Sequence, residues 1–198
     1  SKKVIVGPSE SMSKSKKNII DPEYIINNFG ADSARLFILS DSPPEKDVQW
    51  SDEGISSSYK FIQKLWQLDQ KISDEIIKDH KKDLDDKITK YTNKFLKKMT
   101  ENLISFSYNK LIANLHEMYS FLNQEIKKIY TKKTIVENYS KILITMMPII
   151  PHFAYECIRK NNIKIDEIWP RYDEKMLIEE NINFVVQING KKRGLIAA

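Results

Sequence analysis

Cysteine and glycine are scarce in this sequence, and each scarcity excludes a class of protein. The single cysteine, Cys157, rules out an internal disulfide and a zinc site built from cysteines, and its apolar helical surroundings predict a buried side chain. Five glycines and seven prolines in 198 residues argue against a β-sandwich. No run of about 18 apolar residues occurs and no signal peptide opens the chain, so we expect a cytosolic protein with no membrane partner.

The excess of positive charge is small. Thirty-two Lys and Arg residues against 27 Asp and Glu residues give a net charge of +5. This balance favours a polyanionic partner, although simply solvated lysines explain it equally well. Hydrophobic residues make up 41% of the chain, which is enough for a substantial core.

The sequence gives no sign of a metal site or of acid–base catalysis. The histidines, His80, His116 and His152, are far apart and lie near no cysteine or paired carboxylates, so we expect no metal ligands. His152 follows a proline, and we expect it to form a hydrogen bond at a helix start. An acidic cluster consists of Asp83, Asp85 and Asp86. It lies near a helix start, where N-capping explains it better than catalysis.

Residues 8–20 form the most unusual stretch. Small side chains dominate it, and three lysines occupy four positions from Lys14 to Lys17. This composition is poor for a helix or a strand and predicts a loop whose ammonium and hydroxyl groups face solvent or a phosphate. A flexible linker is the plain alternative. A helix start follows at once, with Asp21 suited to the N-cap and Pro22 to the first turn.

The next segments predict short helices. The first spans 22–29 and ends at Gly30, and the second runs to about Leu39 with Asp32 as its cap. Arg35 lies in the middle of the second helix, and we expect it to be a structural ion-pair partner. Prolines at 43 and 44 make residues 40–50 a loop, and Ser51 is a strong N-cap candidate for the helix that follows.

Four long apolar stripes with helical spacing follow. They run from Ile55 to Ile76, from Leu84 to Leu103, from Tyr108 to Leu122 and from Ile135 to Ile150. Spacings of three and four residues place each stripe on one helix face, with Asp69 as the polar exception, so we assign their aromatic and methionine residues to a core. Pro148 and Pro151 end or kink the fourth helix, and a shorter helix carries Phe153 to Ile158.

The fold class that follows is mainly α: an antiparallel helix bundle with an N-terminal loop and stem-contact region and a short C-terminal β-hairpin. The hairpin is indicated by Phe184 to Ile188, an Asn-Gly turn at 189–190, and Lys191 to Ile196. We expect boundaries at 1–52 for the loop region, 53–170 for the bundle, and 171–198 for a linker and the start of a truncated further domain.

Several segments resemble one family. They are 11–15, 21–23, 29–37, 42–54, 148–154, 169–170 and 186–194. Together they are similar to the bacterial-type leucyl-tRNA synthetases of class I, and residues 11–15 resemble the Lys-Met-Ser-Lys-Ser signature loop of that class. Ser11 stands where the first lysine of the signature usually sits, and Lys14 occupies the position of the second.

The resemblance implies an enzyme that activates leucine with ATP and transfers it to leucine tRNA, with Mg²⁺ accompanying the ATP. Lys14 would be catalytic, stabilising charge on the reacting phosphates. The ATP-binding residues implied are Ser11, Met12, Ser13, Lys14 and Ser15. The family disregards the anticodon bases. We see no ligand set for the metal and no protein partner.

Basic residues beside the apolar stripes are candidate tRNA contacts, because phosphate neutralisation dominates nucleic-acid affinity. They are Lys90, Lys94, Lys97, Lys98, Lys127, Lys128, Lys132, Lys133, Lys191, Lys192 and Arg193. Each lysine on its own is equally well explained as solvated. The aromatic residues fall on the core stripes rather than on an exposed platform on which bases could stack.

Two alternatives stay open. One is a stand-alone basic helical RNA-binding module without catalysis, and the other is a class I synthetase specific for isoleucine, valine or methionine. The His-x-Gly-His motif of the class does not occur, so the chain by itself lacks part of the active site. Residues 3–6 read as a strand without a sheet, so we expect a fragment of a longer protein that is inactive alone.

Overall fold

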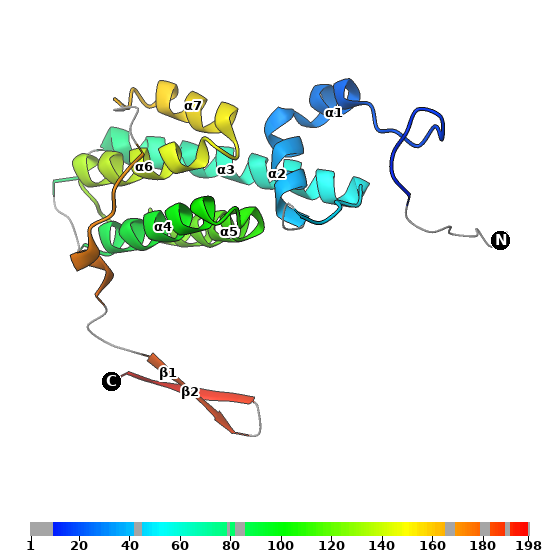
Figure 1. Ribbon diagram of the computed structural model, residues 1–198. Helices are drawn as coiled ribbons and strands as arrows, with labels where there is room; N and C mark the ends of the chain where they lie inside the picture. Colours follow the sequence, from blue (N-terminus) through cyan, green and yellow to red (C-terminus); the bar gives the residue numbers. More distant parts are fainter. Residues whose placement is uncertain are drawn as a thin grey trace.

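The computed structural model describes residues 10–41, 45–78, 80–81, 86–164, 169–178, 183–188 and 191–197. Within these ranges it is mostly helical, as predicted, with seven α-helices, a short 3-10 helix and two strands (Figure 1). The helices are α1 (Pro22–Phe29), α2 (Ala31–Asp41), α3 (Asp52–Lys78), α4 (Lys87–Ile104), α5 (Tyr108–Glu125), α6 (Lys132–Met146) and α7 (Pro151–Lys160), and η1 spans Glu174–Leu177. None of the described helices is both long and apolar enough to cross a lipid bilayer.

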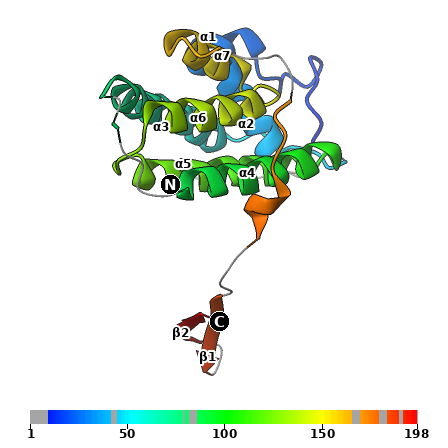
Figure 2. The same ribbon diagram turned by 90° about the vertical axis from the view of Figure 1, so that its left-hand side faces the viewer.

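The long helices pack around one large apolar core. In Figures 1 and 2, α4 and α5 lie below α3 and α6, and α7 lies above them. The four stripes supply this core: Ile72, Met99, Leu115 and Ile142 are each at most 1% exposed. Tyr59 is an exception to the predicted stripe because it lies 37% exposed at the edge of a cleft rather than in the core.

A second, smaller core lies at the N-terminal end. Ile25 of α1, Phe37 of α2 and Ile55 of α3 are buried together, with Trp50 packed edge-on against Phe37 at a ring distance of 5.2 Å. Leu36, next to Phe37 on α2, belongs to the large core instead. Helix α2 therefore joins the two cores, and α3 runs through both.

Local capping positions the N-terminal helices largely as predicted. The Asp21 carboxylate accepts a hydrogen bond from the Glu23 amide at 3.0 Å, and the Ser51 hydroxyl accepts one from the Gly54 amide at 3.1 Å. Gly30 ends α1 with a φ of 84°, a conformation that costs glycine least. Asp32 was predicted wrongly as the cap of α2: the helix begins at Ala31, which leaves the Asp32 carboxylate free for another helix.

The start of α4 also departs from the prediction. Helix α4 begins at Lys87, and Asp86 occupies its N-cap position without a side-chain hydrogen bond to the helix. The other members of the predicted cap cluster, Asp83 and Asp85, lie outside the described residues, as does Leu84 at the head of the predicted stripe. Farther along, α6 ends at Met146 and α7 begins at Pro151, so the prolines divide these helices as expected.

Asp69, the polar exception in the first stripe, is fully buried at the centre of a hydrogen-bond network. The Tyr139 hydroxyl and the Asn161 amide donate to its Oδ1 at 3.0 and 2.9 Å, and the Lys160 ammonium donates to Oδ2 at 3.0 Å. These contacts tie α3 to α6 and α7. Cys157 beside the network is fully buried, as predicted, and burial raises the pKa of its thiol, which keeps it protonated.

Strands β1 (Asn183–Ile188) and β2 (Lys191–Ala197) pair antiparallel, with Val185 opposite Leu195. The register shifts between Val186 and Gln187, which marks an irregularity in the ladder. The predicted Asn-Gly turn at 189–190 lies outside the described residues.

Gly54 of α3 allows a close approach to the Phe37 side chain of α2. A Cβ added there would overlap the ring of Phe37, which is buried and held by Trp50. We expect Gly54→Ala to lower the free energy of unfolding by about 1–3 kcal/mol, the usual cost of overpacking. Urea denaturation measures the change. Ser57→Ala, three residues on and exposed, is the control and should stay within about 0.5 kcal/mol. Equal stability of both variants would contradict this packing.

Candidate functional site

The loop of residues 11–18, called the signature loop below, is closed by its own hydrogen bonds. The Asn18 side chain accepts from the Ser13 amide at 2.8 Å and donates to the Ser11 carbonyl at 3.3 Å. Between these points the Lys17 amide donates to the Lys14 carbonyl at 3.2 Å, and Lys17 adopts a positive φ of 53°. Asn18 therefore holds the two ends of a tight turn together, a role that the residue pattern did not predict.

The turn presents Lys14 to solvent. Its side chain is exposed and forms no ion pair with any residue that the structure describes, whereas Lys16 pairs with Glu10 at 2.8 Å. The hydroxyls of Ser13 and Ser15 share a hydrogen bond at 3.2 Å, and Ser13 also accepts from the Lys16 amide. Lys14 and Lys17, which is also exposed and forms no ion pair among the described residues, thus carry the charges in this turn that are available to an anionic ligand.

A cleft of about 420 Å³ lies beside the base of the signature loop. The wall opposite the loop comes from residues 47–50, which belong to the predicted loop of residues 40–50. Trp50 is fixed there because its indole N–H donates to Asp52 at 2.9 Å. The cleft is lined by Glu10, Ser11, Met12, Asn18, Asp47, Val48, Gln49 and Trp50. The predicted residues Ser11 and Met12 therefore face a cleft, while Lys14 does not line it.

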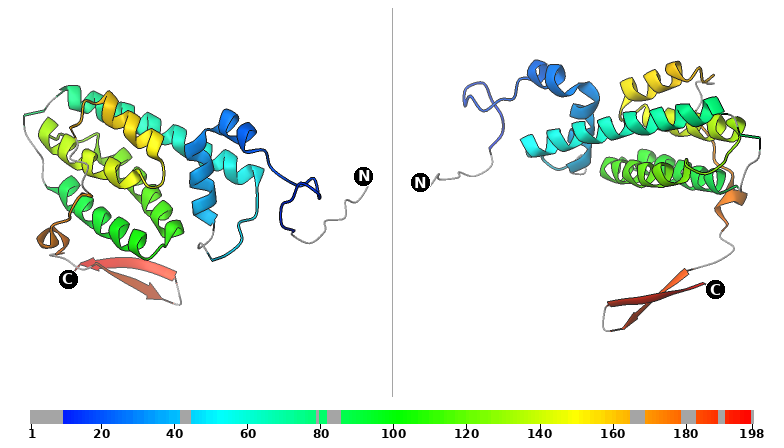
Figure 3. Two further views of the ribbon diagram at one scale, coloured as in Figure 1. Left: turned by 45° about the horizontal axis from the view of Figure 1, so that its top comes forward. Right: turned by 180° about the vertical axis from the view of Figure 1, so that it is seen from behind.

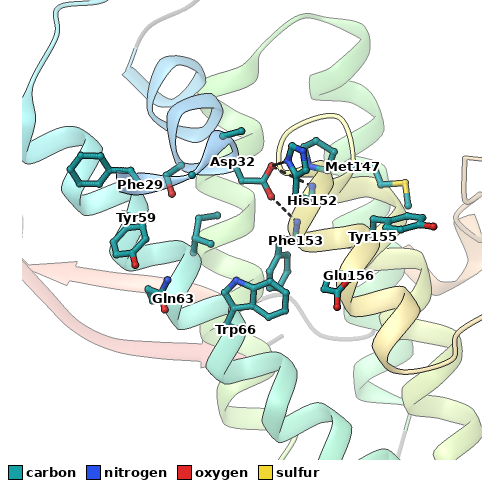
Figure 4. A pocket seen from close by; sticks show the side chains of 15 residues that line it. Phe29, Asp32, Tyr59, Gln63, Trp66, Met147, His152, Phe153, Tyr155 and Glu156 are labelled. Atoms are coloured by element: carbon teal, nitrogen blue, oxygen red, sulfur yellow. Dashed lines mark hydrogen bonds and ion pairs between the residues drawn. The ribbon is translucent and has the colours of Figure 1, made fainter. Parts of the chain in front are cut away.

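Asp32 of α2 caps α7, a helix 120 residues farther along the chain. Its carboxylate accepts hydrogen bonds from the Phe153 amide at 2.7 Å, the His152 amide at 3.3 Å and the His152 ring nitrogen Nδ1 at 2.9 Å (Figure 4). Ile150, at the N-cap of α7, has no side-chain acceptor, so the helix takes its cap from Asp32. The predicted hydrogen bond of His152 at a helix start is confirmed.

Arg35, one turn along α2, contacts the other side of the same corner. Its Nε donates to the Ile149 carbonyl at 2.9 Å, and its Nη2 donates to the Pro148 carbonyl at 2.6 Å. The prediction of an ion pair was therefore wrong, because the guanidinium serves backbone carbonyls that follow α6. Hydrogen bonds to charged groups contribute about 1.5–3 kcal/mol each. We call Asp32, Arg35 and the corner of residues 147–153 the α2 clamp.

A larger cleft of about 830 Å³ lies beside the α2 clamp. Figure 4 shows Phe29 and Tyr59 on one side, Tyr155 and Glu156 of α7 on the other, and Trp66 between them. Its lining is mainly apolar and includes several aromatic rings. Phe29 stacks edge-on against Tyr59 at 5.9 Å, and Trp66 against Phe153 at 4.9 Å. The junction between α2 and α7 is therefore partly open on this side.

The lysines predicted to contact tRNA differ in whether a carboxylate lies close to them. Four of them face a carboxylate. Lys97 lies 3.9 Å from Glu101, Lys98 lies 2.9 Å from Glu117, and Lys128 lies 2.8 Å from Glu125. Lys133 likewise lies 3.9 Å from Glu137, and Lys127 and Lys132 are exposed. Lys191, Lys192 and Arg193 belong to β2, where the backbone alone is described.

Glu125 organises part of this basic surface. It is 4% exposed and accepts hydrogen bonds from the Tyr130 hydroxyl at 2.7 Å and from the ammonium groups of Lys87 and Lys128. Burial by itself would raise its pKa, but the hydrogen bonds from Lys128, Tyr130 and Lys87 outweigh burial and hold the pKa of Glu125 below its ordinary value. A buried anion therefore anchors two lysines at one end of the bundle.

Lys90 and Lys94 line a hollow of about 430 Å³ on α4. Its floor includes Tyr91 and Phe121, whose rings stack nearly parallel at 3.7 Å. Both rings are half-buried, so the prediction that the aromatics fill the core holds only in part here. Burial raises the pKa of Tyr91, which therefore stays protonated. The hollow lies near the start of α4, at the opposite end of the molecule from the signature loop (Figures 1 and 3).

The histidines do not converge. His80 contacts Glu75 at 3.0 Å, His116 stacks on Phe61 at 3.8 Å, and His152 belongs to the α2 clamp. Within the described ranges no three His, Cys, Asp or Glu side chains gather into a possible metal site.

Two family models match the chain. Residues 85–197 match the one described as "Anticodon-binding domain of tRNA ligase", and residues 4–51 match "tRNA synthetases class I (I, L, M and V)". The first covers most of the helix bundle and the strands, and the second contains the signature loop and both short helices.

Similar curated proteins are leucine–tRNA ligases. The chain is 40% identical over 197 residues to the one from Orientia tsutsugamushi, covering 97% of this chain and 23% of that protein, and 36% identical over 194 residues to the one from Ehrlichia canis, covering 95% and 23%. The chain thus spans about a quarter of the length of these relatives. A crystal structure of the ternary complex of Agrobacterium radiobacter K84 agnB2 LeuRS with tRNA and LeuAMS has the same fold, with a TM-score of 0.77 and 22% identity over 94% of this chain and 25% of that one.

Glu125→Gln tests the buried anion. At pH 7 we expect a loss of about 1–3 kcal/mol in the free energy of unfolding, because an amide cannot satisfy three donors of which two are charged. The folded pKa of Glu125 is lowered, so this stabilisation is present above about pH 4.3 and is lost as the pH falls through the folded pKa. Urea denaturation of the parent protein and of Glu125→Gln at pH 7 and about pH 3 should show a smaller difference in the free energy of unfolding in acid. The control is Glu117→Gln, because Glu117 is exposed and paired with Lys98 and its loss should change stability little. If the stability difference between Glu125→Gln and the parent persists in acid, this account is refuted.

Proposed function

Because the chain belongs to the anticodon-binding domain family of tRNA ligases, we propose that it is one portion of a leucine–tRNA ligase. The intact enzyme would activate leucine with ATP, release pyrophosphate, and transfer leucine to leucine tRNA in the cytoplasm. The observation that carries the proposal is similarity to leucine–tRNA ligases along nearly the whole chain, including the signature loop.

We assign three parts to this portion. Residues 1–52 carry the signature loop and the stem-contact helices, 53–170 form the antiparallel bundle that binds tRNA, and 171–198 form a linker and a β-hairpin that begins a further C-terminal domain. The separate core of Ile25, Phe37 and Ile55 supports a distinct N-terminal part, although α3 contributes Ile55 to it.

In the activation step Lys14 would stabilise the charge that develops on the ATP phosphates. Its exposed ammonium at the tip of a hydrogen-bonded turn suits that task, because a preorganised charge needs little rearrangement during the reaction. Ser13 and Ser15 hold the turn and could offer hydroxyls to the nucleotide. Mg²⁺ would accompany the ATP, and within the described residues no three His, Cys, Asp or Glu side chains gather to hold it.

In tRNA binding the lysines would contact phosphates rather than read bases. Lys90 and Lys94 line the hollow on α4, so a strand passing over it would meet two charges together. Lys98 is already paired with Glu117 and would have to break that contact to reach a phosphate. The lysines of this surface should therefore contribute unequally to the free energy of tRNA binding.

Lys14→Ala tests the role of the signature loop in the intact enzyme. We expect leucine-dependent ATP–pyrophosphate exchange to slow by at least about 100-fold, the usual scale for removing one preorganised transition-state contact. Lys16→Ala, which removes a neighbouring lysine paired with Glu10, and Ser11→Ala should each cost far less. Equal losses in all three variants would show that the roles are assigned wrongly.

A salt titration of leucine tRNA binding to this chain tests the phosphate contacts. With about four phosphates neutralised, log affinity should fall with log salt at a slope of roughly −3 to −4. Lys90→Ala should make the slope shallower by about one, and Lys98→Ala should change it less. Substituting the anticodon bases of the tRNA should leave affinity unchanged. A slope near zero would remove the electrostatic account, and a large loss on anticodon substitution would mean that the bases are read.

A further inference from the structure

We propose that Asp32 and Arg35 are positioning residues that fix the signature-loop segment in one orientation relative to the helix bundle. With that orientation fixed by the α2 clamp, tRNA bound to the bundle would be correctly placed relative to the signature-loop segment for the transfer of leucine. This inference rests on the proposed function and adds to it a specific role for two residues outside the signature loop.

The connectivity leaves room for such a device. Chain order runs from the signature loop through α1 and α2 to α3, and α3 is the one covalent route between the described N-terminal helices and the bundle. Leu36 in the large core also holds α2 against the bundle, but apolar contacts are not directional as hydrogen bonds are. The α2 clamp adds a polar attachment, away from the axis of α3, at the α6–α7 corner.

The chemistry of the clamp matches both helix ends that meet at this corner. Asp32 and Arg35 are three residues apart, so they lie on one face of α2. The anion faces the first free N–H groups of α7, and the cation faces carbonyls that follow α6. A helix start carries partial positive charge and a helix end partial negative charge, so each side chain meets its complement.

The proline residues keep those backbone groups available. Pro151 has no N–H, which leaves His152 and Phe153 as the first donors of α7. Pro148 prevents α6 from continuing, so its own carbonyl and that of Ile149 can accept from Arg35. The corner thus presents two donors and two acceptors to one turn of α2.

An open cleft lies beside the clamp, so at this place the hydrogen bonds of the clamp, rather than core packing, hold the helices in position. Across that cleft the aromatic walls do not close on each other, so packing restrains α1 and α7 only weakly on this side (Figure 4). The His152 ring is 74% exposed and Arg35 is exposed, whereas the core around Leu36 continues beneath them. Removing the clamp should therefore loosen an orientation while leaving the core intact.

The experiment compares two reactions of the intact enzyme. Asp32→Asn and Arg35→Gln should leave leucine-dependent ATP–pyrophosphate exchange, measured without tRNA, within about twofold of the parent enzyme. The kcat for charging leucine tRNA should fall at least about tenfold, since small misplacements of bound reactants cost rates of that order. The KM for tRNA should change less than the kcat, because the lysine–phosphate contacts remain.

Glu156→Gln is the matched control. It makes the same change from carboxylate to amide on α7, but the Glu156 side chain is 42% exposed and pairs with Arg159 on its own helix, so both reactions should be unchanged. Arg35→Lys keeps the charge but not the fork of two donors, and should recover part of the charging rate lost in Arg35→Gln. His152→Ala leaves the backbone hydrogen bonds and should be the mildest clamp variant.

The outcomes separate this inference from the proposed function. If the parent enzyme performs neither reaction, the proposed function fails. If the parent is active and the clamp variants lose exchange and charging in parallel, or lose neither, the positioning role is overturned. Thermal unfolding of every variant completes the test: if all the clamp variants lose their folded structure, the contacts serve folding and the inference is also overturned.

Discussion

The hydrogen bonds from one turn of α2 to the α6–α7 corner set the arrangement on which the rest of the molecule depends. Helix ends leave backbone donors and acceptors without partners, and at the start of α7 the N-cap residue Ile150 offers no side-chain acceptor. Asp32 and Arg35 satisfy both ends from another helix. As a result, the segment that carries the signature loop has a defined position against the bundle.

Two buried carboxylates organise the bundle in the same way. Asp69 holds α3 to α6 and α7, and Glu125 gathers Tyr130 and two lysines at the end of α5. A buried charge without partners is strongly unfavourable, so each network stabilises the fold only while it is complete. Polar groups inside this core therefore specify which helices meet, while the apolar stripes supply most of the burial.

The residues proposed to act on the nucleotide and on the RNA lie at two ends of the molecule. Lys14 lies in a turn closed by Asn18, and the hollow with Lys90 and Lys94 lies near the start of α4. In a leucine–tRNA ligase the first would serve the nucleotide and the second the RNA. Helix α3 has 27 residues and is therefore roughly 40 Å long. One continuous helix thus connects these two regions.

The sequence by itself determined the features that depend on neighbours along the chain. Asp21 and Ser51 cap helices through bonds that span two or three residues, and the helical spacing of apolar residues identified the core. Only the tertiary structure decided that Asp32 caps α7 and that Asp69 is a hub, because their partners lie about 70 to 120 residues away. Side chains of the same type can be capped, paired or solvated, and the packing of distant helices selects among these states.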